Sequence, residues 1–428
     1  MTYEEALNFI HSVSWKGSVP GLERIARLLH LMGDPQKKLR FIHLAGTNGK
    51  GSTSALLSNV LTQAGYRVGL CTSPYITCFE ERMQIDGVPI SREKLAEVTE
   101  FVSPFAMSME DRATEFETVC AITMEYFARE KCDIVVLETG MGGRLDATNV
   151  IEKPECAVIT NIGLDHTQQL GETVELIALE KAGIIKPGAP TVIYEQQASV
   201  IEAVAGVCRE KDSELTVADF GKIRPVENSP EGQRFAFGGE EYDLPLLGAH
   251  QLKNAAVALT AVEVLRSSGW HIPESAVKKG LAGVKWPARF EIISRKPWFV
   301  VDGGHNPQCA ETVAENIKTY FPDKKMLLLV GILKDKDFGA MTDILSTAAD
   351  GFVTVTPDNP RALPSGELAA HLEKYGKPVY DCGSVAEGVR KALALAARDK
   401  DTAVCAVGSL YMAGEIRLAV SEWLRGGK

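Results

Sequence analysis

The stretch FIHLAGTNGKGS, residues 41–52, decides how the chain folds. Its first five residues are typical of a buried strand, and the pattern from Thr53 to Leu61 after it is typical of a helix. A loop between such elements points backbone N–H groups and a helix N-terminus at one phosphate. Lys50 can place a charge on the outer phosphates, and Ser52 can give a hydroxyl to Mg²⁺. The stretch therefore predicts a protein that uses a nucleoside triphosphate.

This loop departs from the general phosphate-loop pattern in two ways. Leu44 stands where the first glycine is expected, and Gly51 separates Lys50 from Ser52. A glycine-rich turn that binds no ligand is the alternative interpretation. The lysine, the hydroxyl and the flanking periodicity together favour phosphate binding. The residues expected to contact the nucleotide here are Gly46, Thr47, Asn48, Gly49, Lys50, Gly51 and Ser52.

Length and composition are those of an ordinary globular protein. Its 428 residues exceed what one hydrophobic core supports, so we expect two domains. No stretch is long and apolar enough for a bilayer, and the start MTYEEALNFIH lacks a signal-peptide pattern, so we expect a soluble, cytoplasmic protein without a membrane partner. Nine cysteines without a C-x-x-C pair indicate reduced thiols. A net charge of −10 argues against a nucleic-acid partner.

Alternating strand and helix patterns predict two α/β domains. In the first part, strand-like runs at 66–71, 133–137 and 157–160 alternate with helical patterns at 117–130 and 172–183, which predicts a parallel sheet. Short β-like pieces from about 208 to 247 predict a small β lobe. A second alternation starts near residue 297. The fold class expected is thus α/β: a P-loop-type, mostly parallel sheet domain with a small β lobe, plus a second Rossmann-like α/β domain.

The boundary between the domains is expected near Gly283 to Arg289, where a proline and a glycine interrupt the pattern. We assign residues 1–293 to an N-terminal ATP-binding domain. Residues 294–428 form the C-terminal domain in this assignment.

Three polar residues follow or accompany buried strands of the first domain. Glu138 ends the strand DIVVLE and has the form of a Mg²⁺-organising carboxylate, although a structural acid is the alternative. Taken alone, His166 is typical of a hydrogen-bonded structural histidine and Lys181 of a solvated helix lysine. Because the carboxyl ends of parallel strands converge on one crevice, the three together predict a site.

Two strand-end loops carry the polar residues of the second domain. DGGHNP, residues 302–307, and LKDKD, residues 333–337, lie where a second domain could close on a nucleotide. A helix N-cap at Asn306 and an ion-pair turn are the alternative interpretations.

Taken together, these motifs resemble one family, the folylpolyglutamate synthases and bifunctional dihydrofolate synthases of the Mur ligase superfamily. The resemblance runs nearly from end to end. It rests on LAGTNGKGS (44–52), TSPYI (72–76), ERMQIDG (81–87), FE (116–117), ETGMGGRLDATN (138–149), NIGLDHTQQLG (161–171), EKAGIIKPG (180–188), HQLKNAAVA (250–258), WPARFE (286–291), DGGHNP (302–307) and GILKDKD (331–337). The unusual phosphate loop is then the family's own form.

The resemblance implies a role for individual residues in the metal sites. Lys50 would lie on the outer phosphates and Ser52 on a first Mg²⁺, with Ser73, Glu138 and His166 around a second. Lys181 matches the lysine that is carbamylated in this superfamily, which would turn it into an anionic group beside the second metal.

The resemblance also implies contacts with nucleotide and substrates. Asn254 and Arg289 match nucleotide-contacting positions, and Asp302 and His305 match positions that meet the nucleotide and the glutamate. The segment from Ser73 to Arg82 matches the mobile loop beside the pterin pocket. Its residues expected to contact substrate are Ser73, Pro74, Tyr75 and Arg82.

The activity implied is an ATP-dependent amide ligation. The resemblance implies a monomer with ATP and two Mg²⁺ that adds L-glutamate to a reduced folate, and also to dihydropteroate, through an acyl phosphate. Another Mur-type ligase acting on a non-folate carboxylate is the alternative.

Three other classes of protein fit the sequence less well. Peptidoglycan-building relatives carry an extra N-terminal domain, for which the 45 residues before the loop are too few. A switch GTPase would need an N-K-x-D motif, which does not occur. A binding module without catalysis explains poorly why the site residues occur together.

Overall fold

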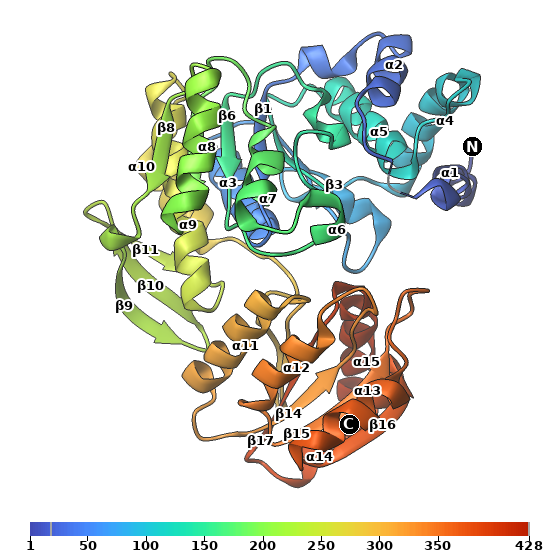
Figure 1. Ribbon diagram of the computed structural model, residues 1–428, viewed down its shortest axis with the longest axis vertical. Coiled ribbons are helices and arrows are strands. Elements are labelled where there is room, and N and C mark those ends of the chain that lie inside the picture. Colours follow the sequence, from blue (N-terminus) through green and yellow to red (C-terminus); the bar gives the residue numbers. More distant parts are fainter. Residues whose placement is uncertain (18, 427–428) are drawn as a thin grey trace.

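Two α/β halves make up the chain and lie one above the other in Figure 1. The computed structural model describes residues 1–17 and 19–426. An eight-stranded sheet with the order β4-β3-β2-β5-β1-β6-β7-β8 forms the centre of the first half. Its strands are β1 (Phe41–Ala45), β2 (Val68–Cys71), β3 (Met83–Ile85), β4 (Val88–Pro89), β5 (Ile134–Glu138), β6 (Cys156–Ile159), β7 (Thr191–Tyr194) and β8 (Leu215–Ala218). In the order of the sheet, the six strands β2-β5-β1-β6-β7-β8 run parallel to one another. The remaining two, β3 and β4, form an antiparallel edge beside β2.

Helices cover both faces of this sheet because its central strands are apolar on both sides. The helices are α1 (Tyr3–His11), α2 (Glu23–Leu31), α3 (Lys50–Gln63), α4 (Arg92–Ser108), α5 (Glu115–Arg129), α6 (Thr167–Leu170), α7 (Val174–Ala182), α8 (Ala198–Glu210), α9 (Ala249–Ser267) and α10 (Glu274–Ala282). Ile42 and Leu44 of β1 share a core with α3, α9 and α10, whereas Phe41 shares one with α2, α4 and α5. Alternate residues of a strand point to opposite faces, so β1 is buried on both.

A small three-stranded antiparallel sheet packs against the first half. It consists of β9 (Arg224–Ser229), β10 (Gly232–Phe237) and β11 (Glu240–Leu244). Phe235 and Tyr242 turn into the core that α9 and α10 share. The expected β lobe is therefore present, but β8, from the same stretch of sequence, joins the large sheet as an edge strand.

The second half contains a six-stranded sheet with the order β12-β13-β17-β14-β15-β16. Its strands are β12 (Glu291–Arg295), β13 (Trp298–Val301), β14 (Lys325–Val330), β15 (Gly351–Thr356), β16 (Val379–Ser384) and β17 (Thr402–Val407), all parallel except the β12-β13 pair. The helices α11 (Pro307–Tyr320), α12 (Phe338–Ser346) and α13 (Ser365–Leu372) cover one face, and α14 (Val385–Arg398) and α15 (Ala413–Gly426) cover the other. The expected fold class is confirmed.

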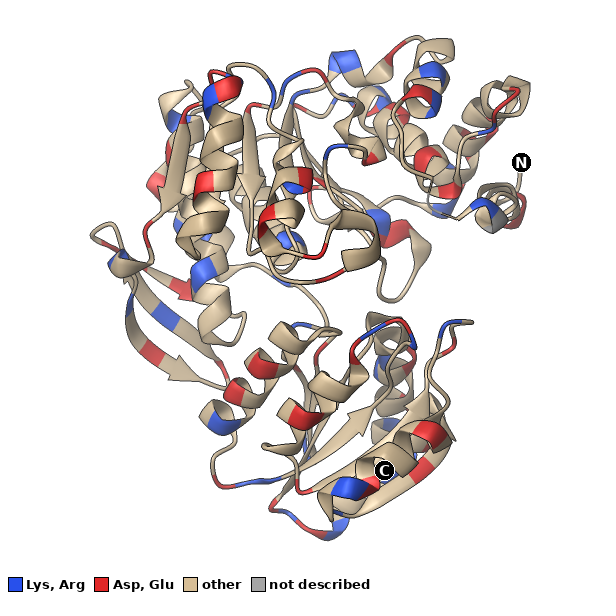
Figure 2. Ribbon diagram, viewed as in Figure 1, with Lys and Arg blue, Asp and Glu red and all other residues tan. Residues whose placement is uncertain are grey.

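Residues of both charges, coloured along the ribbon in Figure 2, are interspersed along the helices of both halves. Many of these residues form local ion pairs, such as Arg67 with Glu130, Arg129 with Glu125 and Lys374 with Asp343. Among the residues that the structure describes, no helix combines the length and the apolar character needed to cross a membrane.

Candidate active site

The phosphate loop joins β1 to α3 in a conformation that only its glycines permit. Gly49 precedes the first residue of α3 with φ +88°, and a Cβ there would lie 2.5 Å from Asn254 Oδ1. The backbone N–H groups of Thr47 and Asn48 donate to Asn161 O at 2.8 and 3.2 Å, which ties the loop to the segment after β6. The N-terminus of α3 therefore opens onto a loop of fixed shape, as phosphate binding requires.

Two lysines converge on one carbonyl of this loop. Lys50 Nζ donates to Gly46 O at 2.9 Å, and Lys181 Nζ donates to the same oxygen at 2.7 Å. Lys181 is 4% exposed, so it is not the solvated helix lysine of the alternative interpretation. Burial, with the Lys50 charge added to it, lowers the pKa of Lys181 well below its usual value. A cationic pocket with one readily deprotonated amine results.

Glu138 lies at the end of β5 beside these lysines. Its side chain is 5% exposed, and its carboxylate accepts the backbone N–H of Ser73 at 3.1 Å. Burial raises the pKa of Glu138, while the charge of Lys50, the Ser73 hydrogen bond and the charge of Arg289 oppose this rise. An acidic oxygen in such a buried setting is suited to neutralisation by a cation.

Asp146 shapes the loop that follows Glu138, a role that sequence reasoning missed because nothing sets it apart within the motif ETGMGGRLDATN. Its carboxylate accepts the N–H groups of Gly140 and Met141, both at 2.9 Å, and the N–H and hydroxyl of Thr148 at 3.0 and 2.6 Å. Gly143 of this loop packs so closely on α7 that a Cβ would lie 2.6 Å from Lys181 O. The loop and α7 therefore fix each other, and with them the position of Lys181.

His166 is the N-cap residue directly before α6 and has a left-handed conformation, with φ +51°. Its side chain is 41% exposed, and its Nε2 lies 3.9 Å from Asp165 Oδ1. Burial lowers the pKa of His166, and the charge of Asp165 offsets part of that effect. The ring is thus accessible, as a metal ligand would need to be.

Asp302 shapes the backbone that carries Arg289. Its Oδ2 accepts the N–H of Phe290 at 2.8 Å, and its Oδ1 accepts the N–H of Gly304 at 2.7 Å. The residues on either side of Arg289, Ala288 and Phe290, have φ values of +55° and +46°. Such left-handed residues persist only where the surroundings impose them. Burial raises the pKa of Asp302, and the charge of Arg289 opposes the rise.

Most residues predicted for the site line one cavity of about 870 Å³. The predicted residues on its wall are Gly46, Thr47, Asn48, Gly49, Lys50, Gly51, Ser52, Ser73, Pro74, Arg82, Glu138, His166, Lys181, Asn254, Arg289, Asp302 and His305. Tyr75 does not line it: its ring packs on Phe79, with the Arg82 guanidinium over it at 5.4 Å. The volume is in the range of sites for drug-sized ligands, and both halves contribute to the wall.

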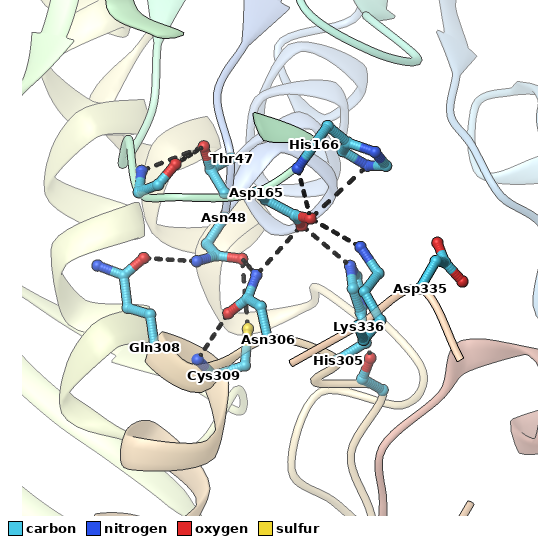
Figure 3. Close-up of polar contacts among 12 residues, drawn as sticks. Thr47, Asn48, Asp165, His166, His305, Asn306, Gln308, Cys309, Asp335 and Lys336 are labelled. Atoms are coloured by element: carbon cyan, nitrogen blue, oxygen red, sulfur yellow. Dashed lines mark hydrogen bonds and ion pairs between the residues drawn. The ribbon is translucent and has the colours of Figure 1, made fainter. Parts of the chain in front are cut away.

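Side chains from both halves meet at the phosphate loop, as Figure 3 shows. Asn48 Nδ2 donates to Gln308 Oε1 at 2.6 Å, and Asn306 Nδ2 donates to Asn48 Oδ1 at 3.0 Å. Lys336 Nζ donates to Asp165 Oδ1 at 2.7 Å. The alternative interpretation of Asn306 as a helix N-cap also holds, because its Oδ1 accepts the N–H of Cys309 at the start of α11.

The described residues contain no ready-made cluster of three or more histidine, cysteine or acidic side chains for a metal. Ser52 and Glu138 nevertheless offer buried oxygen donors on the wall of the cavity. The predicted metal ligands therefore stay predictions.

Comparisons with known proteins agree with this architecture. Residues 44–262 match the Mur ligase middle domain, and residues 288–410 match the Mur ligase glutamate ligase domain. The dihydrofolate synthase/folylpolyglutamate synthase of Bacillus subtilis is 36% identical, covering 97% of this chain and 98% of its own length. The folylpolyglutamate synthase of Lacticaseibacillus casei is 35% identical, with 100% of both chains covered.

Solved structures of such enzymes have the same fold. The folylpolyglutamate synthase of Mycobacterium tuberculosis, complexed with ADP and AMPPCP, has a TM-score of 0.88 at 32% identity, covering 97% of this chain and 98% of its own. Escherichia coli FolC, in complex with DHPP and ADP, has a TM-score of 0.87 at 29% identity, covering 99% of both chains. The fold and site define an ATP-dependent ligase of the Mur type, and within that class the chain belongs to the folylpolyglutamate synthase/dihydrofolate synthase family.

Proposed function

We propose that this protein uses ATP to join L-glutamate to the carboxylate of a reduced folate, and that it also accepts dihydropteroate. The observation that carries the proposal is the single cavity that unites the phosphate loop, the buried Glu138 and Lys181, and the Asp302 to Cys309 segment of the second half. Family membership supports the folate acceptor. The alternative, a non-folate carboxylate, keeps the same chemistry and changes only the acceptor.

The chemistry explains why such a site needs concentrated positive charge. A carboxylate is a poor acyl donor, so its oxygen first attacks the γ-phosphorus of ATP, releasing ADP and leaving an acyl phosphate. The amine of glutamate then attacks the acyl carbon, and phosphate leaves as the amide forms. Because the acceptor and the γ-phosphate are both anionic, Lys50 and Arg289 would neutralise their repulsion. The same charges would stabilise the transition state.

The donor set fits Mg²⁺, a hard cation that prefers oxygen ligands. The Ser52 hydroxyl and the Glu138 carboxylate are both buried on the cavity wall, and each has capacity for a further contact. We assign Ser52 to a first ion, and Ser73, Glu138 and His166 to a second. Bound there, Mg²⁺ would stabilise the charge on the transferring phosphoryl group.

Lys181 fits the chemistry of a carbamate. An amine adds to carbon dioxide only in its neutral form, and burial beside Lys50 lowers the pKa of Lys181 in this direction. Loss of one proton gives the neutral amine, and formation of the N–C bond with carbon dioxide releases a second proton, so a buried cation becomes an anionic oxygen ligand. That change would also remove the repulsion between Lys181 and Lys50.

The remaining predicted contacts are with the nucleotide, the glutamate and the folate. We assign Asn254, together with Arg289 and Asp302, to the nucleotide, and His305 to the glutamate. The segment from Ser73 to Arg82 would lie beside the folate. The relative from E. coli is in complex with DHPP as well as ADP, which supports a second ligand beside the nucleotide in this chain. Tyr75 would reach the folate only by movement of its segment.

The test supplies purified protein with ATP, Mg²⁺ and L-glutamate and compares tetrahydrofolate with dihydropteroate as acceptor. Mass spectrometry should find each acceptor extended by one glutamate, with ADP and phosphate as co-products. Product from only one acceptor would restrict the activity to it. If neither is extended, the folate assignment is wrong and the non-folate alternative takes its place.

Two further expectations stay predictions about the assembly. We propose a monomer, which light scattering of the purified chain measures. We also propose domain limits of 1–293 and 294–428, although β12 spans that limit. Limited proteolysis should cut near residues 283–289 if the linker lies there.

A further inference from the structure

Asp165 lies where the phosphate loop, the predicted metal ligand His166 and the second half all meet. It belongs to the segment after β6, and its side chain is 12% exposed. That segment is bound to the phosphate loop: Thr47 Oγ1 donates to Gly163 O at 3.0 Å and accepts from Gly163 N at 3.1 Å. Together with the bonds from Thr47 and Asn48 to Asn161, these contacts make the two loops one rigid unit.

Each oxygen of the Asp165 carboxylate has more than one partner. Oδ1 accepts the backbone N–H of His166 at 2.9 Å and the Nζ of Lys336 at 2.7 Å. Oδ2 lies 3.5 Å from Asn306 Nδ2 and 3.7 Å from His305 Nε2. One side chain thus supports the left-handed turn at His166 and receives three side chains of the second half (Figure 3).

Lys336 makes this contact from a buried position. Its side chain is 9% exposed, and it extends from the loop after β14, whose backbone closes on itself through Lys336 N to Leu333 O at 3.2 Å. Ion pairs shielded from solvent depend strongly on both partners, because removing one leaves a buried charge unpaired. The pair therefore differs from the exposed ion pairs on the helices, whose contribution is small.

We propose that Asp165 and Lys336 form an interdomain latch, which couples docking of the second half to the position of His166. By keeping the halves closed, this latch protects the acyl phosphate from water. The proposal rests on the proposed function. Both are positioning residues, since they act through His166 and through the closed arrangement of the halves. Asn306 adds a neutral contact to Asn48 at the same seam.

The latch matters because the acyl phosphate has two competing fates. When glutamate attacks the acyl carbon, the amide forms, phosphate leaves and the amine loses a proton. When water attacks instead, the carboxylate is regenerated, phosphate is released and the ATP is wasted. Domain closure excludes water from such intermediates. Weakening the latch should therefore raise the amount of phosphate released for each amide formed.

The first experiment measures that ratio in the full chain with ATP, Mg²⁺, L-glutamate and the acceptor that the unmodified protein extends. Lys336→Met and Asp165→Asn should each raise the ratio of phosphate to amide by about tenfold, as expected for loss of a buried pair. Lys336→Arg, which keeps the charge, should restore most of the coupling. The double variant should be no worse than either single one, because the two changes remove the same interaction.

The matched control is the exposed pair Lys325 and Asp399, 3.0 Å apart, neither of which lines the cavity. Lys325→Met should leave the ratio unchanged. An unchanged ratio in Lys336→Met, or additive effects in the double variant, would overturn the latch. Failure of the unmodified protein to form amide from any folate acceptor would instead overturn the proposed function.

The second experiment needs no acceptor and so tests the latch even if the folate assignment fails. Small-angle X-ray scattering of the chain with ATP analogue and Mg²⁺ should show a larger radius of gyration for Lys336→Met than for Lys336→Arg or Lys325→Met. Equal radii for all of these variants would show that the pair does not hold the halves together.

Discussion

At the scale of single residues, the site brings two ammonium groups to one carbonyl oxygen, Gly46 O, a short distance from a buried carboxylate. Two like charges in so little space are unfavourable unless one of them is lost or compensated. Lys181 is the one whose pKa is lowered well below its usual value. A carbamate on Lys181 would resolve the conflict and add a ligand for a cation.

Replacing Lys181 by alanine should reduce turnover by about 100-fold, as loss of a metal-supporting group does. A short carboxylate such as acetate should restore part of the rate, because it can take the place of the carbamate. Steady-state kinetics across an acetate series measures this. A variant that is fully active without acetate would show that the lysine has no such role.

Glu138→Ala should lower kcat by about 100-fold or more, since a charge-organising group at a phosphoryl-transfer site is removed. The protein should remain folded, because the change also removes a carboxylate whose pKa is raised by burial. Turnover and thermal melting are measured on the same preparation. An unchanged kcat would exclude Glu138 from the metal site.

At the scale of elements, β1 contains a buried histidine that links stability to pH. The Thr148 hydroxyl donates to Asp146, so it can accept from His43 Nε2, 2.9 Å away, which places a proton on Nε2. Burial, and then the charge of Lys186, lowers the pKa of His43 to about 3. The histidine of the unfolded chain has a pKa of about 6.5, so below that pH it binds a proton that His43 in the folded chain does not bind.

Stability should therefore fall as the pH drops below about 6.5, and the loss from His43 should continue down to the folded pKa of about 3. The slope expected from this one group is about 1.4 kcal/mol per pH unit. In His43→Gln, which keeps a polar group near Thr148, urea unfolding between pH 6.5 and 5 should show a slope smaller by about that amount. Equal slopes in both proteins would mean that His43 binds its proton equally well in the folded and the unfolded chain.

The close packing of the Gly143 loop on α7 gives a second test at this scale. Gly143→Ala would place a methyl group 2.6 Å from Lys181 O and 2.8 Å from Glu180 O, both of them backbone atoms that cannot turn aside. We expect a loss of about 1–3 kcal/mol in unfolding free energy and reduced activity, because Lys181 moves with the loop.

Gly206→Ala, within α8, is the matched control. Its new methyl group has open space apart from an arginine tip 3.9 Å away, so the change should be neutral or stabilising by up to about 1 kcal/mol. Similar losses in both variants would show that the contact with α7 is not the cause.

The sequence predicted most elements because their signals are local. The helix patterns at 117–130 and 172–183 correspond to α5 (Glu115–Arg129) and α7 (Val174–Ala182), and the strand-end rule brought Glu138, His166 and Lys181 to one cavity. It could not pair Asp165 with Lys336, because 171 residues separate them and both sit in loops. Nor could it place β8 in the large sheet, since an exposed edge strand looks like the lobe beside it.

At the scale of the whole molecule, the site exists only where the halves meet. The first half supplies the phosphate loop and the predicted metal ligands, and the second supplies Asp302, His305 and Lys336. Arg289 lies between them, on backbone that Asp302 holds. A nucleotide-binding half alone could hydrolyse ATP, whereas joining two substrates needs a cavity closed to water. The two halves are therefore both needed, because only together do they enclose the cavity in which the two substrates are joined.

The central claim is that ATP activates the acceptor as an acyl phosphate. The most direct measurement uses an acceptor whose carboxylate carries heavy oxygen and follows the label by mass spectrometry during amide formation. The account predicts that the label passes to inorganic phosphate and that ADP is the nucleotide product. Label found in AMP with release of pyrophosphate, or phosphate without label, would contradict it.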